Sequence, residues 1–230
     1  MIPLRDVNPT RRRPWVTWLL IATNVWVFIY QLSLSPYATE LFVRRYGVVP
    51  YRLTEDLSLL ALVSPVTSMF MHGGWMHLIS NMWFLHIFGD NVEDQIGKGR
   101  YALFYLMCGL AAVVAQVSID PSSHVPMVGA SGAIAGVLAG YVSLSPRARV
   151  LTLVPIFIFI QFVEIPAFFF IFVWFAIQLL GSHASLAQVG SGMGGVAFFA
   201  HVGGFVAGLL LMPLFRQGSA RPRKARSLRP

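Results

Sequence analysis

Residues Gly129-Ala-Ser-Gly-Ala-Ile-Ala-Gly-Val-Leu-Ala-Gly-Tyr-Val-Ser-Leu-Ser145 form an uncharged stretch in which glycine recurs at every fourth position. Gly132, Gly136 and Gly140 therefore fall on one face of a helix, where small residues let a second helix backbone approach closely inside a membrane. A hydroxyl group, Ser131, directly precedes the first of these glycines. The stretch is predicted to be a membrane helix in close contact with another helix.

The composition of the whole chain agrees with this interpretation. Of the 230 residues, 56% are apolar and only 11% are charged, and the mean hydropathy is +0.67. Soluble domains carry about 25% charged residues, so this chain cannot build a surface that faces water throughout. This composition argues against a soluble enzyme. The single cysteine, Cys108, excludes an internal disulfide and a zinc site built on several cysteines.

Six segments approach the length of about 20 apolar residues that crosses a bilayer core of about 30 Å. They are expected near residues 15–33, 72–90, 101–118, 129–145, 166–181 and 197–215. We expect an all-α, polytopic membrane protein, a six-helix bundle with a long interfacial first loop. Its organisation is a tail (1–14), a membrane domain (15–215) and a basic tail (216–230).

The apolar run from Val150 to Leu180 needs a break, because as one helix it would be about 46 Å long. Pro155 and Pro166 are the natural places, since proline ends or begins helices. We therefore assign Leu151 to Ile165 to an interfacial connection. The first loop, about Leu34 to Ser68, mixes charged and apolar residues and is expected to lie partly in the membrane interface.

Basic residues predict the orientation, because loops rich in Lys and Arg stay in the cytoplasm. Four precede the first span, two follow the second, two follow the fourth and six follow the sixth, which places 14 of 17 on one side. The protein is thus expected in the inner (plasma) membrane of the cell, with both termini in the cytoplasm. The basic tail is interpreted as this topology signal, with no nucleic acid as a partner.

Three polar groups share one depth in the predicted spans. Ser131, His201 and His77 each lie about 21–22 Å from the cytoplasmic end of their helix, at a rise of 1.5 Å per residue. That level is roughly 10 Å below the outer surface of a core of about 30 Å, where a cavity opening outward admits water. Ionisable groups within membrane spans are costly and mark functional sites.

A hydroxyl in contact with an imidazole supplies a nucleophile and a general base. We expect helices 129–145 and 197–215 to pack along their glycines and bring Ser131 to His201. No acid lies at the matching depth, so a dyad is predicted, and the sequence does not identify a third group. The His77 imidazole, the Asn81 amide and the first turn of the helix after Gly129 are placed to hold an oxyanion and a substrate backbone.

The chain resembles the rhomboid family of intramembrane serine proteases over roughly residues 15–215. Three segments carry the resemblance: His72-Gly-Gly-Trp-Met-His-Leu-Ile-Ser-Asn81, Gly129-Ala-Ser-Gly-Ala-Ile-Ala-Gly136 and Ala200-His-Val-Gly-Gly-Phe-Val-Ala-Gly208. By this likeness Ser131 is the nucleophile and His201 the base. His77, Asn81 and the Ser131 amide stabilise the oxyanion, and His72 helps to shape the site.

The resemblance implies cleavage of other membrane proteins within or beside their transmembrane helices. It also implies a preference for a small residue before the scissile bond, and a gate formed by the fifth span and the loop after it. Two positions depart from the family pattern. Ser64-Pro65 stand near the place of a Trp-Arg pair found in some members, and Ala135 replaces an aromatic residue that packs on the histidine.

Two other functions are alternatives to a protease. A catalytically silent rhomboid-like protein would bind transmembrane helices without cleaving them, and the presence of both Ser131 and His201 argues against it. A small-solute transporter lacks support, because broken helices and repeat symmetry are not evident. The expected partners are transmembrane substrates and the lipid bilayer. No cofactor and no metal are predicted, since the His-Glu-x-x-His pattern is missing.

Overall fold

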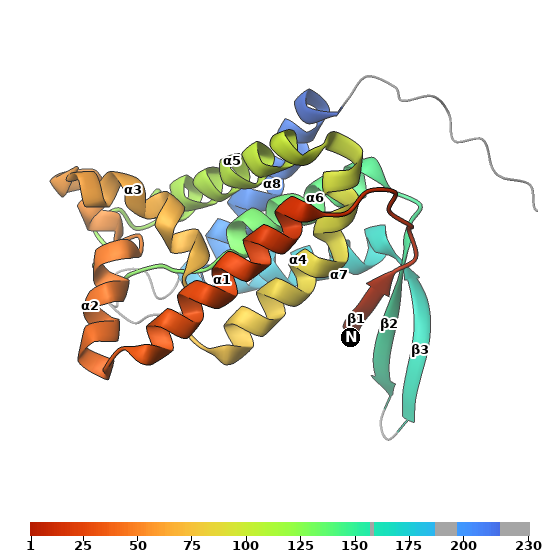
Figure 1. Ribbon diagram of the computed structural model, residues 1–230, viewed down its shortest axis with the longest axis horizontal. Helices are drawn as coiled ribbons and strands as arrows, with labels where there is room; N and C mark the ends of the chain where they lie inside the picture. The colour runs from red at the N-terminus through yellow and green to blue at the C-terminus, as the bar shows by residue number, and fades with distance from the viewer. Residues whose placement is uncertain (157–158, 187–196, 217–230) are drawn as a thin grey trace, which may run out of the picture.

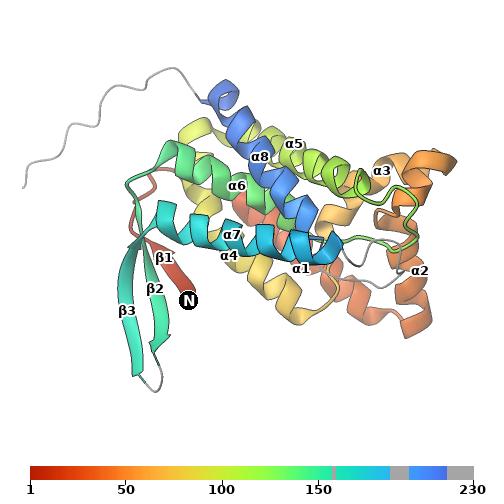
Figure 2. The same cartoon turned by 180° about the vertical axis from the view of Figure 1, so that it is seen from behind.

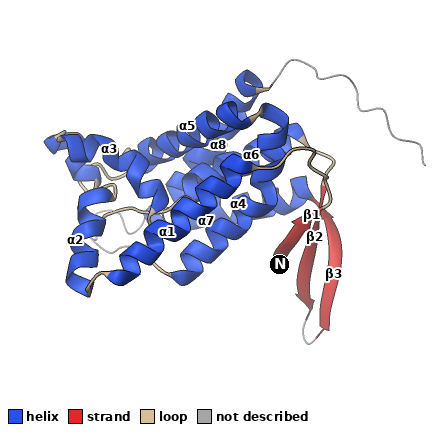
Figure 3. Cartoon of the chain, viewed as in Figure 1, coloured by secondary structure: helices blue, strands red, loops and turns tan. Residues whose placement is uncertain are grey.

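The computed structural model describes residues 1–156, 159–186 and 197–216 and is mostly helical (Figures 1 and 3). The long helices are α1 (Trp15–Ser33), α4 (Trp75–Ile96), α5 (Lys98–Val117), α6 (Ser131–Leu144), α7 (Ala167–Leu186) and α8 (Phe198–Phe215). Each of the six segments predicted from apolar runs thus contains a helix. Within the described residues, α1, α5 and α8 are long and apolar enough to cross a membrane, while Ser131–Leu144 and Ala167–Leu180 are shorter apolar helices.

Helix α6 lies at the centre of the bundle, packed on α4, α5 and α8 (Figure 2). Its residues from Gly132 to Tyr141 are all buried. A Cβ atom added to Gly204 of α8 would collide with the carbonyl oxygen of Gly132, and one added to Gly208 would lie 2.7 Å from the Cα of Gly136. The two backbones are therefore in direct contact, as the four-residue glycine spacing predicted.

A small sheet at one end of the bundle corrects the prediction of an all-α protein. Strands β1 (Ile2–Asp6), β2 (Arg149–Ile156) and β3 (Phe159–Pro166) pair antiparallel in the order β1-β2-β3. Valine, isoleucine, threonine and phenylalanine dominate β2 and β3, and such residues favour strands. The segment predicted as an interfacial connection is thus mostly a hairpin, and the N-terminal tail adds its third strand (Figure 1). We call this end of the bundle the sheet end.

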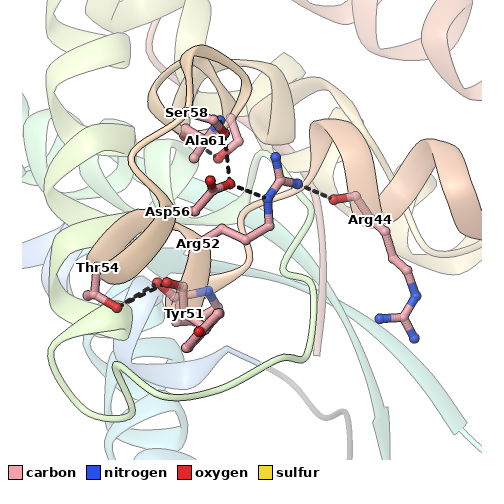
Figure 4. A network of polar contacts seen from close by, with 9 residues as sticks. Arg44, Tyr51, Arg52, Thr54, Asp56, Ser58 and Ala61 are labelled. Atoms are coloured by element: carbon pink, nitrogen blue, oxygen red, sulfur yellow. Dashed lines mark hydrogen bonds and ion pairs between the residues drawn. The ribbon is translucent and has the colours of Figure 1, made fainter.

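The expected long first loop is largely helical at the opposite end of the bundle. It contains α2 (Pro36–Tyr46), a π-helical turn η1 (Arg52–Asp56), α3 (Leu59–Thr67) and a 3-10 turn η2 (Ser68–Phe70). The Arg52 guanidinium donates to the Arg44 carbonyl at 2.7 Å and lies 3.6 Å from the Asp56 carboxylate (Figure 4). This arginine therefore ties the end of α2 to the turn before α3.

Two acidic residues near the C-terminus of α4 hold the start of α1. The buried Glu93 carboxylate accepts from the backbone N–H groups of Val16 and Thr17 at 3.0 and 2.8 Å, and from the Thr17 hydroxyl at 2.9 Å. Asp94 accepts from the backbone of Arg11 and Arg12. A carboxylate at a helix N-terminus pairs with orphan N–H groups and with the positive end of the helix dipole.

A polar cluster joins β1 to the bundle at the sheet end. Asp6 accepts from the Tyr141 hydroxyl at 2.9 Å and from the Asn91 amide at 2.7 Å, and Asn8 donates to Asn91 at 2.7 Å. Burial raises the pKa of Asp6 from 3.8 to about 6, against the opposing effect of the Tyr141 hydrogen bond. The carboxylate therefore takes up its proton more readily in the fold than in the unfolded chain.

The backbone contact between α6 and α8 makes Gly204 intolerant of a side chain. Gly204→Ala is expected to lower the free energy of unfolding by about 1–3 kcal/mol, because the added methyl group overpacks the interface. The measurement is thermal unfolding in detergent micelles. Gly99→Ala is the matched control, since a Cβ there meets nothing within 4 Å. Equal stability of the two variants would contradict the packing.

The raised pKa of Asp6 predicts a pH-dependent difference in stability. Because the folded chain holds this proton more tightly, the contribution of Asp6 to stability falls as pH rises from about 4 through about 6. Asp6→Asn removes that dependence, so its melting temperature should exceed that of the wild type at neutral pH and approach it in acid. Glu55→Gln, at an exposed position, is the control. A pH-independent difference would be inconsistent with the burial of Asp6.

Candidate active site

Ser131 and His201 meet at the α6–α8 contact. The Ser131 Oγ lies 2.7 Å from the His201 Nε2, which is hydrogen-bond distance. The contact expected between these two side chains is therefore present, and their chemical roles stay a prediction. His201 is 9% exposed and Ser131 is half-buried, so the pair is largely shielded from solvent.

The backbone before Ser131 is shaped by a glycine in a left-handed conformation. Gly129 has φ +132°, and its N–H donates to the Ser68 carbonyl at 2.9 Å. A Cβ at this position would lie 2.8 Å from the His77 Nε2 and 3.7 Å from the Ser131 Oγ. Gly129 therefore leaves a small space between the hydroxyl and the imidazole of His77, as expected of a glycine that lets another backbone come close.

The two histidines before and within α4 lie side by side. The ring centroids of His72 and His77 are 4.9 Å apart, and the backbone of buried His72 exchanges two hydrogen bonds with the Gln31 amide. The Gly73 N–H donates to the His77 Nδ1 at 3.4 Å. A neutral imidazole that accepts at Nδ1 carries its proton on Nε2, the atom near Ser131, so His77 presents a donor to the site.

Asn81 lies one helical turn after His77 and is 6% exposed. In the part of the chain that the structure describes, its Nδ2 has no hydrogen-bond partner. A buried polar group without a partner is destabilising and calls for an explanation. The Asn81 Nδ2 is thus a donor that could bond to a ligand oxygen, as the sequence predicts for this residue.

The structure adds a residue that the sequence did not identify. The Gln178 Oε1 of α7 lies 2.6 Å from the His201 Nδ1, on the far side of the ring from Ser131. One turn earlier, the Trp174 ring lies 6.1 Å from the same imidazole. A glutamine within an apolar span was the available signal, since polar residues in such spans are seldom placed without a role.

A pocket beside Ser131 is lined almost entirely by small or flexible residues. Its walls come from η2, α5, α6, α8 and the segments before α6 and α8. They are Ser68, Met69, Gly109, Ala112, Val113, Met127, Val128, Gly129, Ser131, Gly132, Ala133, Ala197 and Ala200. Its narrow apolar walls suit a small side chain. In the described residues, no three His, Cys, Asp or Glu side chains are grouped to hold a metal ion.

Comparison with known proteins decides the family. Residues 61–218 match the Rhomboid domain, a segment that contains α4 to α8 and, of the side chains described in this subsection, all but Gln31. The chain belongs to the rhomboid family. It is accordingly a multi-pass membrane protein. The matched segment leaves out α1, α2 and the strand β1.

The names of the rhomboid relatives differ in the activity that they state. The chain is 31% identical to Rhomboid-like protein 11, chloroplastic, of Arabidopsis thaliana, over 57% of this chain and 42% of that protein. It is 33% identical to Rhomboid protease GluP of Bacillus subtilis, over 59% and 26%, and 37% identical to Inactive rhomboid protein 1 of Drosophila melanogaster, over 34% and 5%. The chain therefore spans less than half the length of these three relatives, which include a protease and an inactive protein.

The unpaired amide of Asn81 predicts an unusual stability effect. Asn81→Leu should leave the melting temperature unchanged or raise it, because an apolar side chain of similar volume replaces a buried donor without a partner. Asn91→Leu is the matched control: its amide is paired with Asp6 and Asn8, so its loss should destabilise the protein by about 1–3 kcal/mol. Equal destabilisation by both would show that Asn81 has a structural partner.

Proposed function

We propose that this rhomboid protein is a serine endopeptidase that cleaves transmembrane protein substrates. The observation that carries the proposal is the 2.7 Å contact between the Ser131 Oγ and the His201 Nε2 in a largely buried site. An alcohol in contact with an imidazole is the minimal arrangement for nucleophilic catalysis of acyl transfer. Ser131 is the proposed nucleophile and His201 the proposed general base.

The proposed reaction has two stages. The Ser131 oxygen attacks the carbonyl carbon of the scissile bond while its proton passes to the His201 Nε2, and this proton then goes to the leaving amine as the C–N bond breaks. Water next attacks the acyl ester on Ser131, with His201 again taking and returning a proton. Each transfer needs the short Oγ–Nε2 distance that the site has.

The oxyanion of the tetrahedral intermediate requires donors that are already in place. The first N–H groups of α6, which begins at Ser131, have no intrahelical acceptor. The His77 Nε2, which faces Gly129, adds a side-chain donor, and the unpaired Asn81 Nδ2, one turn further along α4, is the second proposed side-chain donor. His72 packs against the His77 ring, and Gly129 admits the substrate backbone.

The pocket beside Ser131 supports a preference for a small residue at the cleaved bond. Gly109, Gly132 and Ala133 form part of its wall, and a larger substrate side chain would collide with the α5–α6 contact. A Cβ on Gly132 would already collide with the Ala112 methyl group. The pocket therefore has little room to widen without separating two helices.

In the proposed placement, the protein lies in the inner membrane and crosses it six times, with α1 and α4 to α8. Both termini lie in the cytoplasm. The sheet end carries the start of α1 and the end of α8, whereas Ser131 and His201 lie near the other ends of α6 and α8. The site would thus open to the extracytoplasmic side. The exposed Phe159 and Phe162 of β3 would lie in the lipid interface on the cytoplasmic side.

A rhomboid-like protein that binds helices without cleaving them is the alternative, since one relative is named as inactive. The retained hydroxyl–imidazole contact favours the protease. A direct cleavage assay distinguishes the two proposals. Purified protein is incubated in detergent or liposomes with a single-span substrate that has alanine near the outer end of its helix.

We expect cleavage by the wild type, and loss of at least about 10³-fold in rate in Ser131→Ala and in His201→Ala. A serine-reactive fluorophosphonate should label the wild type and neither variant. Asn81→Leu should fold and lose roughly 10²–10³-fold in kcat, because a single oxyanion donor is removed. Cleavage that persists in Ser131→Ala would refute the proposal, and binding of substrate without cleavage or labelling would favour the silent alternative.

A further inference from the structure

His201 has a hydrogen-bond partner on each side of its ring. The Nε2 contacts the Ser131 Oγ at 2.7 Å, and the Nδ1 contacts the Gln178 Oε1 at 2.6 Å. The three groups come from three helices, α6, α8 and α7. Gln178 is partly buried on α7, which lies at the surface of the bundle beside α6 and α8 (Figure 2).

The chemistry of an amide oxygen determines what this contact does to the imidazole. A carbonyl oxygen accepts a hydrogen bond and cannot donate, so the His201 Nδ1 must carry a proton. A neutral imidazole has one N–H, so its Nε2 is left as a bare acceptor toward Ser131. That is the tautomer a general base needs, because only an unprotonated Nε2 can take the hydroxyl proton.

Other side chains near His201 do not supply this function. Ala135, four residues after Ser131, is fully buried and offers no polar or aromatic group. Trp174 and Phe198 place rings 6.1 and 6.3 Å from the imidazole and confine it without a hydrogen bond to Nδ1. Among the described side chains, Gln178 is the one that bonds to Nδ1.

We infer that Gln178 is a positioning residue for the proposed protease: its amide oxygen orients His201 and holds the tautomer that activates Ser131. The inference rests on the proposed function. It also makes the dyad depend on α7, whose Phe175 stacks on Phe205 of α8 with ring centroids 4.2 Å apart. Displacing α7 would remove the Nδ1 acceptor while leaving the glycine contact of α6 and α8 intact.

The test compares three variants with the wild type in the cleavage assay. Gln178→Leu keeps the size of the side chain and removes the acceptor. Its kcat should fall by roughly 10²–10⁴-fold with little change in KM, as when the tautomer of a catalytic histidine is lost. Gln178→Glu keeps an acceptor at the same reach and should recover most of kcat. Ile177→Ala, at an exposed neighbouring position on α7, is the control and should match the wild type.

A spectroscopic measurement tests the tautomer without relying on protease activity. In ¹⁵N-histidine-labelled protein, the His201 signals are assigned by their loss in His201→Asn. The wild type should show a protonated Nδ1 and an unprotonated Nε2 at neutral pH, and Gln178→Leu should show a mixture of tautomers. Melting temperatures establish that each variant is folded.

The outcomes separate the two proposals. If the wild type neither cleaves nor reacts with fluorophosphonate, the proposed protease function is refuted. The tautomer of His201 in the wild type and in Gln178→Leu then decides whether Gln178 orients the ring. If the wild type cleaves but Gln178→Leu has the same kcat and the same tautomer, the role of Gln178 is refuted and the protease stands. A wild-type His201 protonated on Nε2 would also refute the role of Gln178, since the amide would then donate to Nδ1.

Discussion

The contact between the backbones of α6 and α8 is the constraint on which the site depends. Gly132 and Gly204 leave no room for a side chain between the two helices. Within lipid there is no hydrophobic force to press helices together, so close packing of small residues has to supply the attraction. With this spacing a short hydroxyl and an imidazole bridge the interface at 2.7 Å, whereas a bulkier interface would hold them apart.

The rest of the bundle keeps this contact in a defined geometry. At the sheet end, buried Glu93 holds the N-terminus of α1 on α4, and Asp6 holds β1 to α4 and α6 through Asn91 and Tyr141. Hydrogen bonds of this kind stabilise a membrane protein because unsatisfied polar groups are costly there. At the site end, the amide of Asn81 is buried with its Nδ2 unpaired within the described residues, and Gly129 adopts a positive φ.

Sequence patterns predicted a large part of this arrangement. Helices occupy all six apolar segments, because segment length and hydropathy are properties of the local chain. The shared depth of Ser131 and His201 correctly indicated their contact, since depth along a helix follows from counting residues. Gln178 was missed because its depth matched no recognised motif, and its partner follows only from how α7 rotates and packs on α8. The sheet was missed because its third strand comes from the N-terminal tail, about 145 residues away from its partner β2.

The sequence by itself determined which segments are helical and apolar, which faces carry glycine, and that a hydroxyl and two histidines lie at one level. These features are local or periodic, so they can be counted along the chain. Tertiary structure alone decided that the tail pairs with the hairpin, that Glu93 holds α1, and that Gln178 meets the far side of the His201 ring. Each of these contacts joins side chains from separate elements, and their distances depend on helix rotation and spacing, which the linear pattern does not encode.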